Sequence, residues 1–231
     1  MLRYFILTAF LLFFPCFNWA QDFPSAQPTM IIINEEGEEE EVVSYNGDAP
    51  LKARFLANPE NVGSYIPLYE WTITKSPDEK PIIKRFDENI DYDFLQSGTF
   101  IVELKISFIE GTDTIEYTMD SPFSVTITES KLEVPNAFTP NGDGYNDILK
   151  VKEGYKSIVS FKAMVFTRWG KKICEWHNLE DGWDGRIGGD YASDGAYFLN
   201  IDALGADGIK YEIRKTITLL KGVKDDPSST N

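Results

Sequence analysis

Hydrophobic and polar residues alternate along most of this chain. The clearest case is Thr99–Ile109, where every second residue from Phe100 to Phe108 is apolar and polar residues are confined to the positions between them. A period of two places these apolar side chains on one face of a β-strand, and no segment shows the sustained period of 3.6 residues that a helix requires. The segments Ile115–Met119 and Phe123–Ile127 alternate as well. We therefore predict three consecutive strands here.

The second half of the chain repeats this pattern. Val159–Val165, Tyr197–Ala203 and Ile209–Leu219 each carry apolar residues at alternating positions. Between the last two segments, Asp207-Gly208 predicts a hairpin with a type I′ turn, in which both central residues have positive φ.

Together these patterns predict an all-β protein with two β-sandwich domains in series after a signal peptide. The expected boundaries are residues 1–20 for the signal peptide, 21–131 for the first sandwich, 132–222 for the second and 223–231 for a flexible tail. The length of 231 residues agrees with two domains, since domains commonly contain about 100–200 residues.

The first 20 residues have the composition of a secretory signal peptide. Arg3 supplies the positive charge, Tyr4–Phe14 is the apolar segment, and Ala20 provides a small residue for cleavage before Gln21. A lipid-anchored N-terminus at Cys16 is the alternative. The apolar segment is too short to cross a bilayer, which takes about 20 residues, so we expect no transmembrane span in the mature chain.

Composition and charge narrow the classes of function. The chain has 22 Lys and Arg against 37 Asp and Glu, a net charge of −15. A surface this acidic repels phosphate groups, so we expect no nucleic-acid partner. Cleavage after Ala20 leaves Cys174 as the single cysteine. No internal disulfide is then expected, and stability must come from packing.

The run from Val134 to Asp147 has a different composition from the strands around it. It combines proline, glycine, asparagine and aspartate around the aromatic side chain of Phe138. Proline lacks a backbone donor, glycine permits positive φ, and Asn and Asp bond to their own backbone, so the run suits neither a helix nor a central strand. We predict an ordered loop at the start of the second domain.

Five blocks of residues in the second domain follow one another in a characteristic order. They are the loop beginning at Pro135, the Arg-Trp-Gly segment after Val165, the Trp-Asp-Gly turn, Asp194–Phe198 and Ile217–Lys221. In this order the domain resembles the gliding-motility-associated C-terminal domain, the type B sorting domain of the type IX secretion system. The motif residues that carry the resemblance are Pro135, Asn136, Phe138, Pro140, Asn141, Gly142, Asp143, Gly144, Asn146, Asp147, Arg168, Trp169, Gly170, Trp183, Asp184 and Gly185.

This resemblance implies a set of partners and a destination. The type IX secretion translocon would recognise the folded domain, and a small outer-membrane barrel protein of the kind associated with this class is a further expected partner. The mature protein would be secreted or held at the outer cell surface after signal-peptide cleavage.

The first domain also resembles a known class of module. Gly47-Asp48-Ala49-Pro50-Leu51, the Tyr69-x-Trp71 pair and the segment from Tyr92 to Val102 are similar to those of PKD-like and other immunoglobulin-like modules. The resemblance implies that Trp71 is the core tryptophan of an inner strand. Modules of this kind are usually spacers or binding platforms.

Two interpretations are open for the two tryptophans of the motif, Trp169 and Trp183. The guanidinium of Arg168 is expected to stack on the indole of Trp169, a cation–π contact typically worth ~0.5–2 kcal/mol. Trp169 and Trp183 would then either belong to a recognition surface or pack at the rim of the sandwich. We favour rim packing.

The same loop offers oxygen ligands for a cation. Asn141, Asp143 and Asp147 carry the donors that Ca²⁺ prefers. An EF-hand-like loop would also need acidic or amide residues near Thr139 and Lys150, which are absent. Asx turns explain the same three residues, so we predict no cofactor or metal and keep Ca²⁺ as the alternative.

Candidates for catalysis are weak. Cys174 and His177 are three residues apart, so on a strand they would face opposite sides. Four aspartates could suggest glycoside chemistry, but they lie in turn contexts, where Asp is common for backbone reasons. These are Asp181, Asp184, Asp190 and Asp194. We predict no enzymatic activity.

The sequence therefore predicts a secreted, non-enzymatic protein whose C-terminal domain directs export through the type IX secretion system to the cell surface or the medium. The alternative is a surface adhesin or matrix protein whose PKD-like module binds glycan or protein. An envelope protein that remains in the periplasm is a third interpretation.

Overall fold

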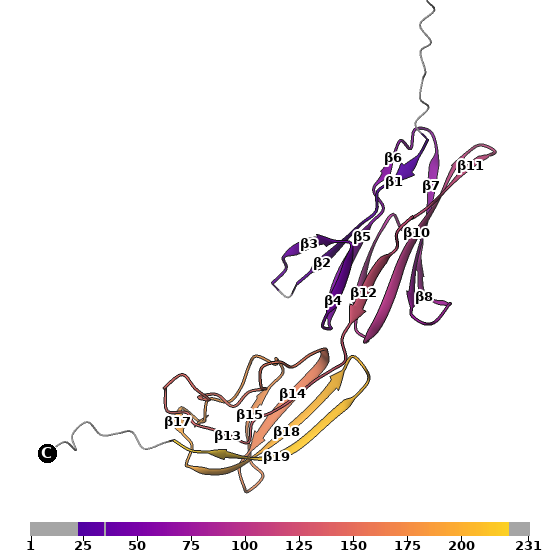
Figure 1. Ribbon diagram of the computed structural model, residues 1–231. Helices are drawn as coiled ribbons and strands as arrows, with labels where there is room; N and C mark the ends of the chain where they lie inside the picture. Colours follow the sequence, from indigo (N-terminus) through magenta and orange to yellow (C-terminus); the bar gives the residue numbers. More distant parts are fainter. Residues whose placement is uncertain (1–22, 35, 222–231) are drawn as a thin grey trace, which may run out of the picture.

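The computed structural model describes residues 23–34 and 36–221. The predicted signal peptide (1–20) and the predicted flexible tail (223–231) lie outside these residues. The all-β class is confirmed: the described residues form strands, turns and loops, arranged as two β-domains joined end to end (Figure 1). They contain no helix long and apolar enough to span a membrane.

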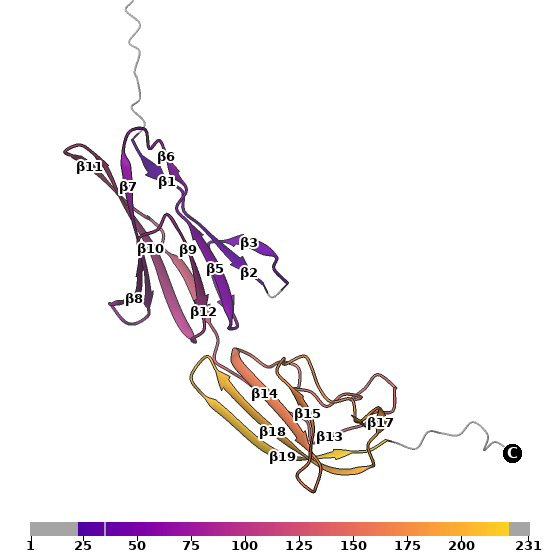
Figure 2. The same cartoon turned by 180° about the vertical axis from the view of Figure 1, so that it is seen from behind.

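The first domain is a sandwich of two sheets with a short extra ribbon. One sheet has the order β3-β2-β5-β9, and the other has the order β4-β12-β10-β7-β8 with β11 also paired to β10. A two-strand ribbon, β1-β6, lies at the outer end (Figures 1 and 2). The strands are β1 Ser25–Ala26, β2 Thr29–Ile33, β3 Glu39–Val42, β4 Ser44–Gly47, β5 Leu51–Leu56, β6 Pro59–Glu60, β7 Ile66–Lys75, β8 Pro81–Arg85, β9 Asn89–Phe94, β10 Gly98–Glu110, β11 Asp113–Thr118 and β12 Phe123–Ile127.

Strand β10 organises this domain because it is long enough to serve three neighbours. Along one edge it pairs with β7, and along the other it pairs first with β12 and then with β11. Its alternating apolar residues, from Phe100 to Phe108, are all buried, as their period predicts. Trp71 on β7 is fully buried against Phe55, with ring centroids 5.9 Å apart.

The second domain has one five-stranded sheet with the order β13-β19-β18-β14-β15. The buried side chains of the sheet pack against the loops between β13 and β14 and between β15 and β18, which include the ribbon β16-β17. The second layer of this domain is therefore built mainly from loops. The strands are β13 Ala137–Phe138, β14 Ile158–Phe166, β15 Lys172–Trp176, β16 Arg186–Ile187, β17 Asp190–Tyr191, β18 Gly195–Gly205 and β19 Lys210–Leu219.

The hairpin predicted between β18 and β19 is present, but its turn is not of type I′. Gly208 has φ +83°, whereas Asp207 is not among the described residues with positive φ. The carboxylate of Asp207 instead accepts hydrogen bonds from the backbone N–H and the hydroxyl of Ser130 at 2.8–2.9 Å. The turn is thus shaped by a residue of the interdomain segment that local sequence rules do not consider.

The joint between the domains centres on Ser157, whose exposure is 2%. Its hydroxyl accepts a hydrogen bond from the Ala49 N–H at 3.2 Å and lies 3.0 Å from the hydroxyl of Thr128. Its carbonyl accepts from the Ala206 N–H, and the Ala206 carbonyl accepts from the Ser97 N–H. Hydrogen bonds from Ala49 and Ser97 of the first domain therefore reach Ser157 and Ala206 of the second.

Candidate functional site

The loop that opens the second domain is attached to the last strand. β13, which holds Ala137 and Phe138, pairs in parallel with Thr218 and Leu219 of β19. Two backbone bonds extend this pairing: the Thr218 N–H donates to the Asn136 carbonyl at 3.0 Å, and the Leu220 N–H donates to the Phe138 carbonyl at 3.2 Å. The first and last segments of the domain thus close on each other.

Three aromatic rings connect the loop layer to the sheet. Trp183 is only 2% exposed, and its indole lies between Phe138 and Tyr197, with centroid separations of 5.3 and 4.9 Å. The indole N–H donates to the Arg186 carbonyl at 2.8 Å, so the buried polar atom is satisfied. Backbone bonds between Trp183 and Leu149 in both directions add a second link between the two loops.

The Trp-Asp-Gly turn needs its glycine for two reasons. Gly185 has φ +80°, a conformation that residues with a side chain rarely adopt, and an added Cβ would lie 2.8 Å from Cγ of buried Pro140. Asp184 accepts a hydrogen bond from the Arg186 N–H at 3.0 Å. Pro140, Asp184 and Gly185 therefore shape the contact between the two loops. Pro135 is half-buried and Asn136 is exposed beside them.

The Asn- and Gly-rich part of the loop is held by its own side chains. The carboxylate of Asp147 accepts from the Gly142 N–H at 2.7 Å and, with its other oxygen, from the Gly144 N–H at 2.8 Å. Asp143 accepts from the Tyr145 N–H and from the side-chain amide of Asn141. These contacts form the predicted Asx-type scaffold.

These bonds also fix the charge state of Asp147. The Gly142 N–H, followed by the Gly144 N–H, stabilises the carboxylate and lowers its pKa below the usual value. Asn146, the residue before Asp147, takes the left-handed conformation with φ +52°. The oxygens of Asp147, which a cation would need, are thus engaged by backbone amides.

The Arg-Trp-Gly motif lies at the tip of the β14–β15 hairpin. The Thr167 N–H donates to the Lys171 carbonyl and the Gly170 N–H to the Thr167 carbonyl, both at 2.9 Å, and Gly170 has φ +80°. The guanidinium carbon of Arg168 lies 4.2 Å from the centre of a Trp169 ring, so the predicted stacking is present.

The two tryptophans of the motif differ in burial, contrary to the rim packing that we favoured for both. Trp183 belongs to the core of the domain, whereas Trp169 is 77% exposed. Sequence patterns could not separate them, because each lies in a loop with a glycine within two residues of it. Only the loop packing decides which indole is covered.

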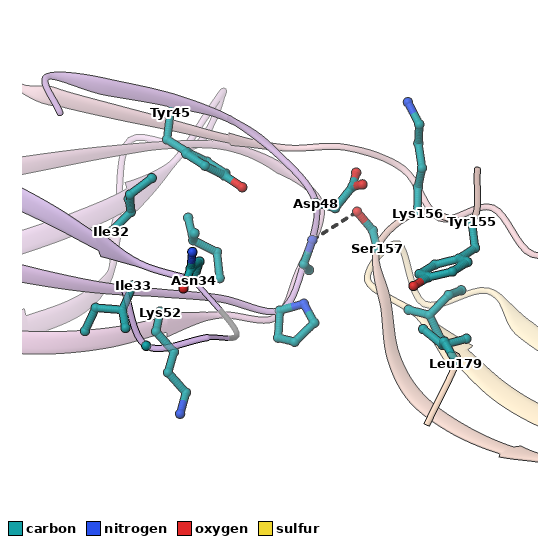
Figure 3. A pocket seen from close by; sticks show the side chains of 15 residues that line it. Ile32, Ile33, Asn34, Tyr45, Asp48, Lys52, Tyr155, Lys156, Ser157 and Leu179 are labelled. Carbon is teal, nitrogen blue, oxygen red and sulfur yellow. Dashed lines mark hydrogen bonds between the residues drawn. The ribbon is translucent and has the colours of Figure 1, made fainter. Parts of the chain in front are cut away.

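A cleft that the sequence did not predict lies at the joint (Figure 3). It has a volume of about 630 Å³, and residues such as Tyr45 and Pro50 of the first domain face Tyr155 and Leu179 of the second. Its walls come from segments about 100 residues apart, so no local motif marks it. Among its charged residues, Lys52 and Lys156 point their amino groups in opposite directions and do not converge on a common ligand.

Two of the candidate catalytic residues, Cys174 and His177, lie in different environments. Burial raises the pKa of the Cys174 thiol, which disfavours the nucleophilic thiolate. His177 has an exposed side chain that contacts Glu175, with Nε2 3.2 Å from Oε1. Within the described residues, no group of three or more His, Cys, Asp or Glu is placed to hold a metal.

The fold and the loop define an all-β protein whose C-terminal domain is closed by pairing of its first and last strands. Residues 132–218 match the family of the CHU_C type IX secretion signal domain. This match confirms the resemblance of the C-terminal domain to type IX secretion signal domains that was stated from its motifs. Such a signal implies export by, and interaction with, the type IX secretion system.

Comparisons over the whole chain are distant. No curated protein sequence matches. Among solved structures, dimeric latent PorU from Porphyromonas gingivalis aligns with 88% of this chain at 11% identity and a TM-score of 0.27, and this chain covers 21% of PorU. A tetra-tandem repeat in the extending region of a large adhesion protein aligns with 87% of this chain at 12% identity and a TM-score of 0.29, with 69% of its own length covered.

We predict that Phe138→Ala lowers the free energy of unfolding of the second domain by about 3–5 kcal/mol, because it opens a cavity beside Trp183. Urea unfolding of the full chain, followed by tryptophan fluorescence, measures this. Trp169→Ala is the control, and we expect it to change the free energy by less than about 0.5 kcal/mol because its side chain is exposed. Equal losses for the two variants would contradict the division between buried and exposed motif residues.

The Asp147 carboxylate should contribute to stability in a pH-dependent way. Because its pKa is lowered in the folded state, its contribution is present above the unfolded-state pKa of about 4 and is lost as the pH falls further. Asp147→Asn should therefore lower the melting temperature at pH 7, and its difference from the unmodified chain should shrink below pH 4. Asp181→Asn, a change in another exposed turn, serves as the control. A difference that stays constant with pH would refute this role.

Proposed function

We propose that this chain is a non-enzymatic exported protein. The first domain is the cargo, and the second domain is the sorting signal that the type IX secretion system recognises. The observation that carries the proposal is the match of residues 132–218 to a type IX secretion signal domain. The closed arrangement of the domain supports it, since pairing of β13 with β19 presents the signal as a folded unit rather than as a linear peptide.

The route to the outside has two steps in this proposal. The N-terminal 20 residues act as a cleaved signal peptide for the inner membrane, since they combine Arg3 with the apolar Tyr4–Phe14 segment. The type IX translocon then moves the folded chain across the outer membrane, with a small outer-membrane barrel protein as a second partner. The destination is the cell surface or the medium.

The cargo domain acts as a PKD-like or immunoglobulin-like interaction module. Two stacked sheets with a buried tryptophan on an inner strand support this assignment. Trp71 is the residue in question, and its indole N–H donates to the Glu88 carbonyl at 3.1 Å. The raised pKa of the Cys174 thiol and the exposed position of His177 support a role without catalysis.

In this proposal the loop between Asn141 and Asp147 works without a cation, because backbone amides already bind both oxygens of Asp147. The melting temperature of the full chain should then be the same in excess Ca²⁺ and in excess chelator. A melting temperature that rises with Ca²⁺ and falls with chelator would establish the loop as a calcium site.

Export is tested by deleting residues 132–231 and measuring where the protein accumulates in a bacterium with a type IX secretion system. We expect the full chain outside the outer membrane and the deletion variant in the periplasm, because the variant lacks the sorting signal. The full chain should also stay in the periplasm of a strain without a working translocon.

A fluorescent reporter that carries residues 129–231 behind the same N-terminal segment is the reciprocal control and should leave the cell envelope. Export of the deletion variant at the level of the full chain would contradict the proposal. So would translocon-independent export of the reporter.

A further inference from the structure

The residues of the signal motif divide into those with a structural task and those without one. Phe138 and Trp183 form the core between loop and sheet, and Asp147 holds its loop. Arg168 and Trp169 neither belong to the core nor hold the loop, because they lie at an exposed hairpin tip. An exposed side chain contributes little to the stability of the fold, so folding alone does not account for this pair of residues.

The hairpin tip holds Arg168 and Trp169 in a defined arrangement. The turn is closed by backbone bonds at both Thr167 and Gly170, and Lys171 adds a bond from its N–H to the Thr167 hydroxyl at 3.2 Å. The guanidinium covers one face of the indole at 4.2 Å. Little conformational entropy is then lost when a partner binds the two side chains.

A surface with two phenylalanines among polar side chains continues from the tip onto the outer face of the sheet. Phe166 and Phe198 lie opposite each other on β14 and β18, and Phe198 is 43% exposed. A shallow hollow of about 450 Å³ lies here, lined by Phe166, Thr167, Arg168, Gly170, Phe198 and Asn200. We call Trp169 and this hollow together the tip surface. It offers an aromatic anchor beside a groove, which is the composition of an interaction hot spot.

The charge of the tip is opposite to that of the chain. The whole sequence carries −15, yet the tip carries Arg168 and Lys171. Neither forms an ion pair among residues 23–34 and 36–221, whereas nearby Lys172 is paired with Glu175. A local positive charge on an acidic molecule orients it toward a negatively charged partner.

We propose that the tip surface is the docking site of the signal domain, and that its occupant is a protein of the type IX secretion machinery with an apolar pocket rimmed by carboxylates. Trp169 fills the pocket, and Arg168 with Lys171 meets the carboxylates. This inference rests on the proposed function and specifies which face of the folded domain the secretion machinery recognises.

The test uses the full chain in a bacterium with a type IX secretion system. Trp169→Ser removes the anchor, and Arg168→Glu reverses the charge at an exposed position. Tyr145→Ser is the matched control, because Tyr145 is also 77% exposed but lies in another loop of the same domain. Thermal melting of each purified variant establishes that the domain is folded.

We expect Trp169→Ser and Arg168→Glu each to lower the exported fraction by about tenfold, the effect of removing one interface anchor, and to accumulate folded in the periplasm. Tyr145→Ser should stay within about twofold of the unmodified chain.

Normal export of both folded tip variants, while deletion of residues 132–231 still blocks export, would overturn the docking site and leave the proposed function intact. An equal loss for Tyr145→Ser would overturn it as well, since the effect would not be specific to the tip. If the deletion variant itself is exported, the proposed function fails, and the docking site fails with it.

Discussion

The second domain depends on the packing of one indole. Trp183 contacts Phe138 on one side and Tyr197 on the other, and these three residues come from the opening loop, the second loop and the sheet. A domain with a single sheet has one apolar face that must be covered, and here loops cover it. Loops carry many backbone polar groups, so such a layer is stable only if those groups are bonded. The Trp183 indole covers the apolar face, and its N–H group and the backbone bonds to Leu149 satisfy polar groups of the loops at the same place.

This requirement explains the unusual composition of the opening loop. Gly142 and Gly144 take positive φ, and the N–H groups they present bind the Asp147 carboxylate. Pro140 is buried against Gly185, where any larger residue would collide. The residues that identify the family in sequence are therefore mostly the residues that make a loop behave as a core layer. Arg168 and Trp169 differ from these residues, because they lie at an exposed hairpin tip outside the core layer.

The strands and their buried faces follow from the sequence because alternation is a local property. The β10 residues from Phe100 to Phe108 are buried as their period of two requires. The order of blocks also sufficed to assign the signal domain. What the sequence did not predict depends on partners far along the chain. The turn at Asp207 is set by Ser130, and the cleft at the joint needs walls from both domains. The exposure of Trp169 likewise follows from how other loops pack.

The joint around Ser157 has one more consequence. The two hydrophobic cores are almost separate. Among the described residues, only Ala206 and Val159 of the second domain pack against the first core, and hydrogen bonds provide further links. Water can satisfy the Ser157 hydroxyl and the Ala206 carbonyl at little cost if the neighbouring domain is exchanged. Because the C-terminal domain has its own core, it does not need this particular neighbour in order to bury its apolar side chains.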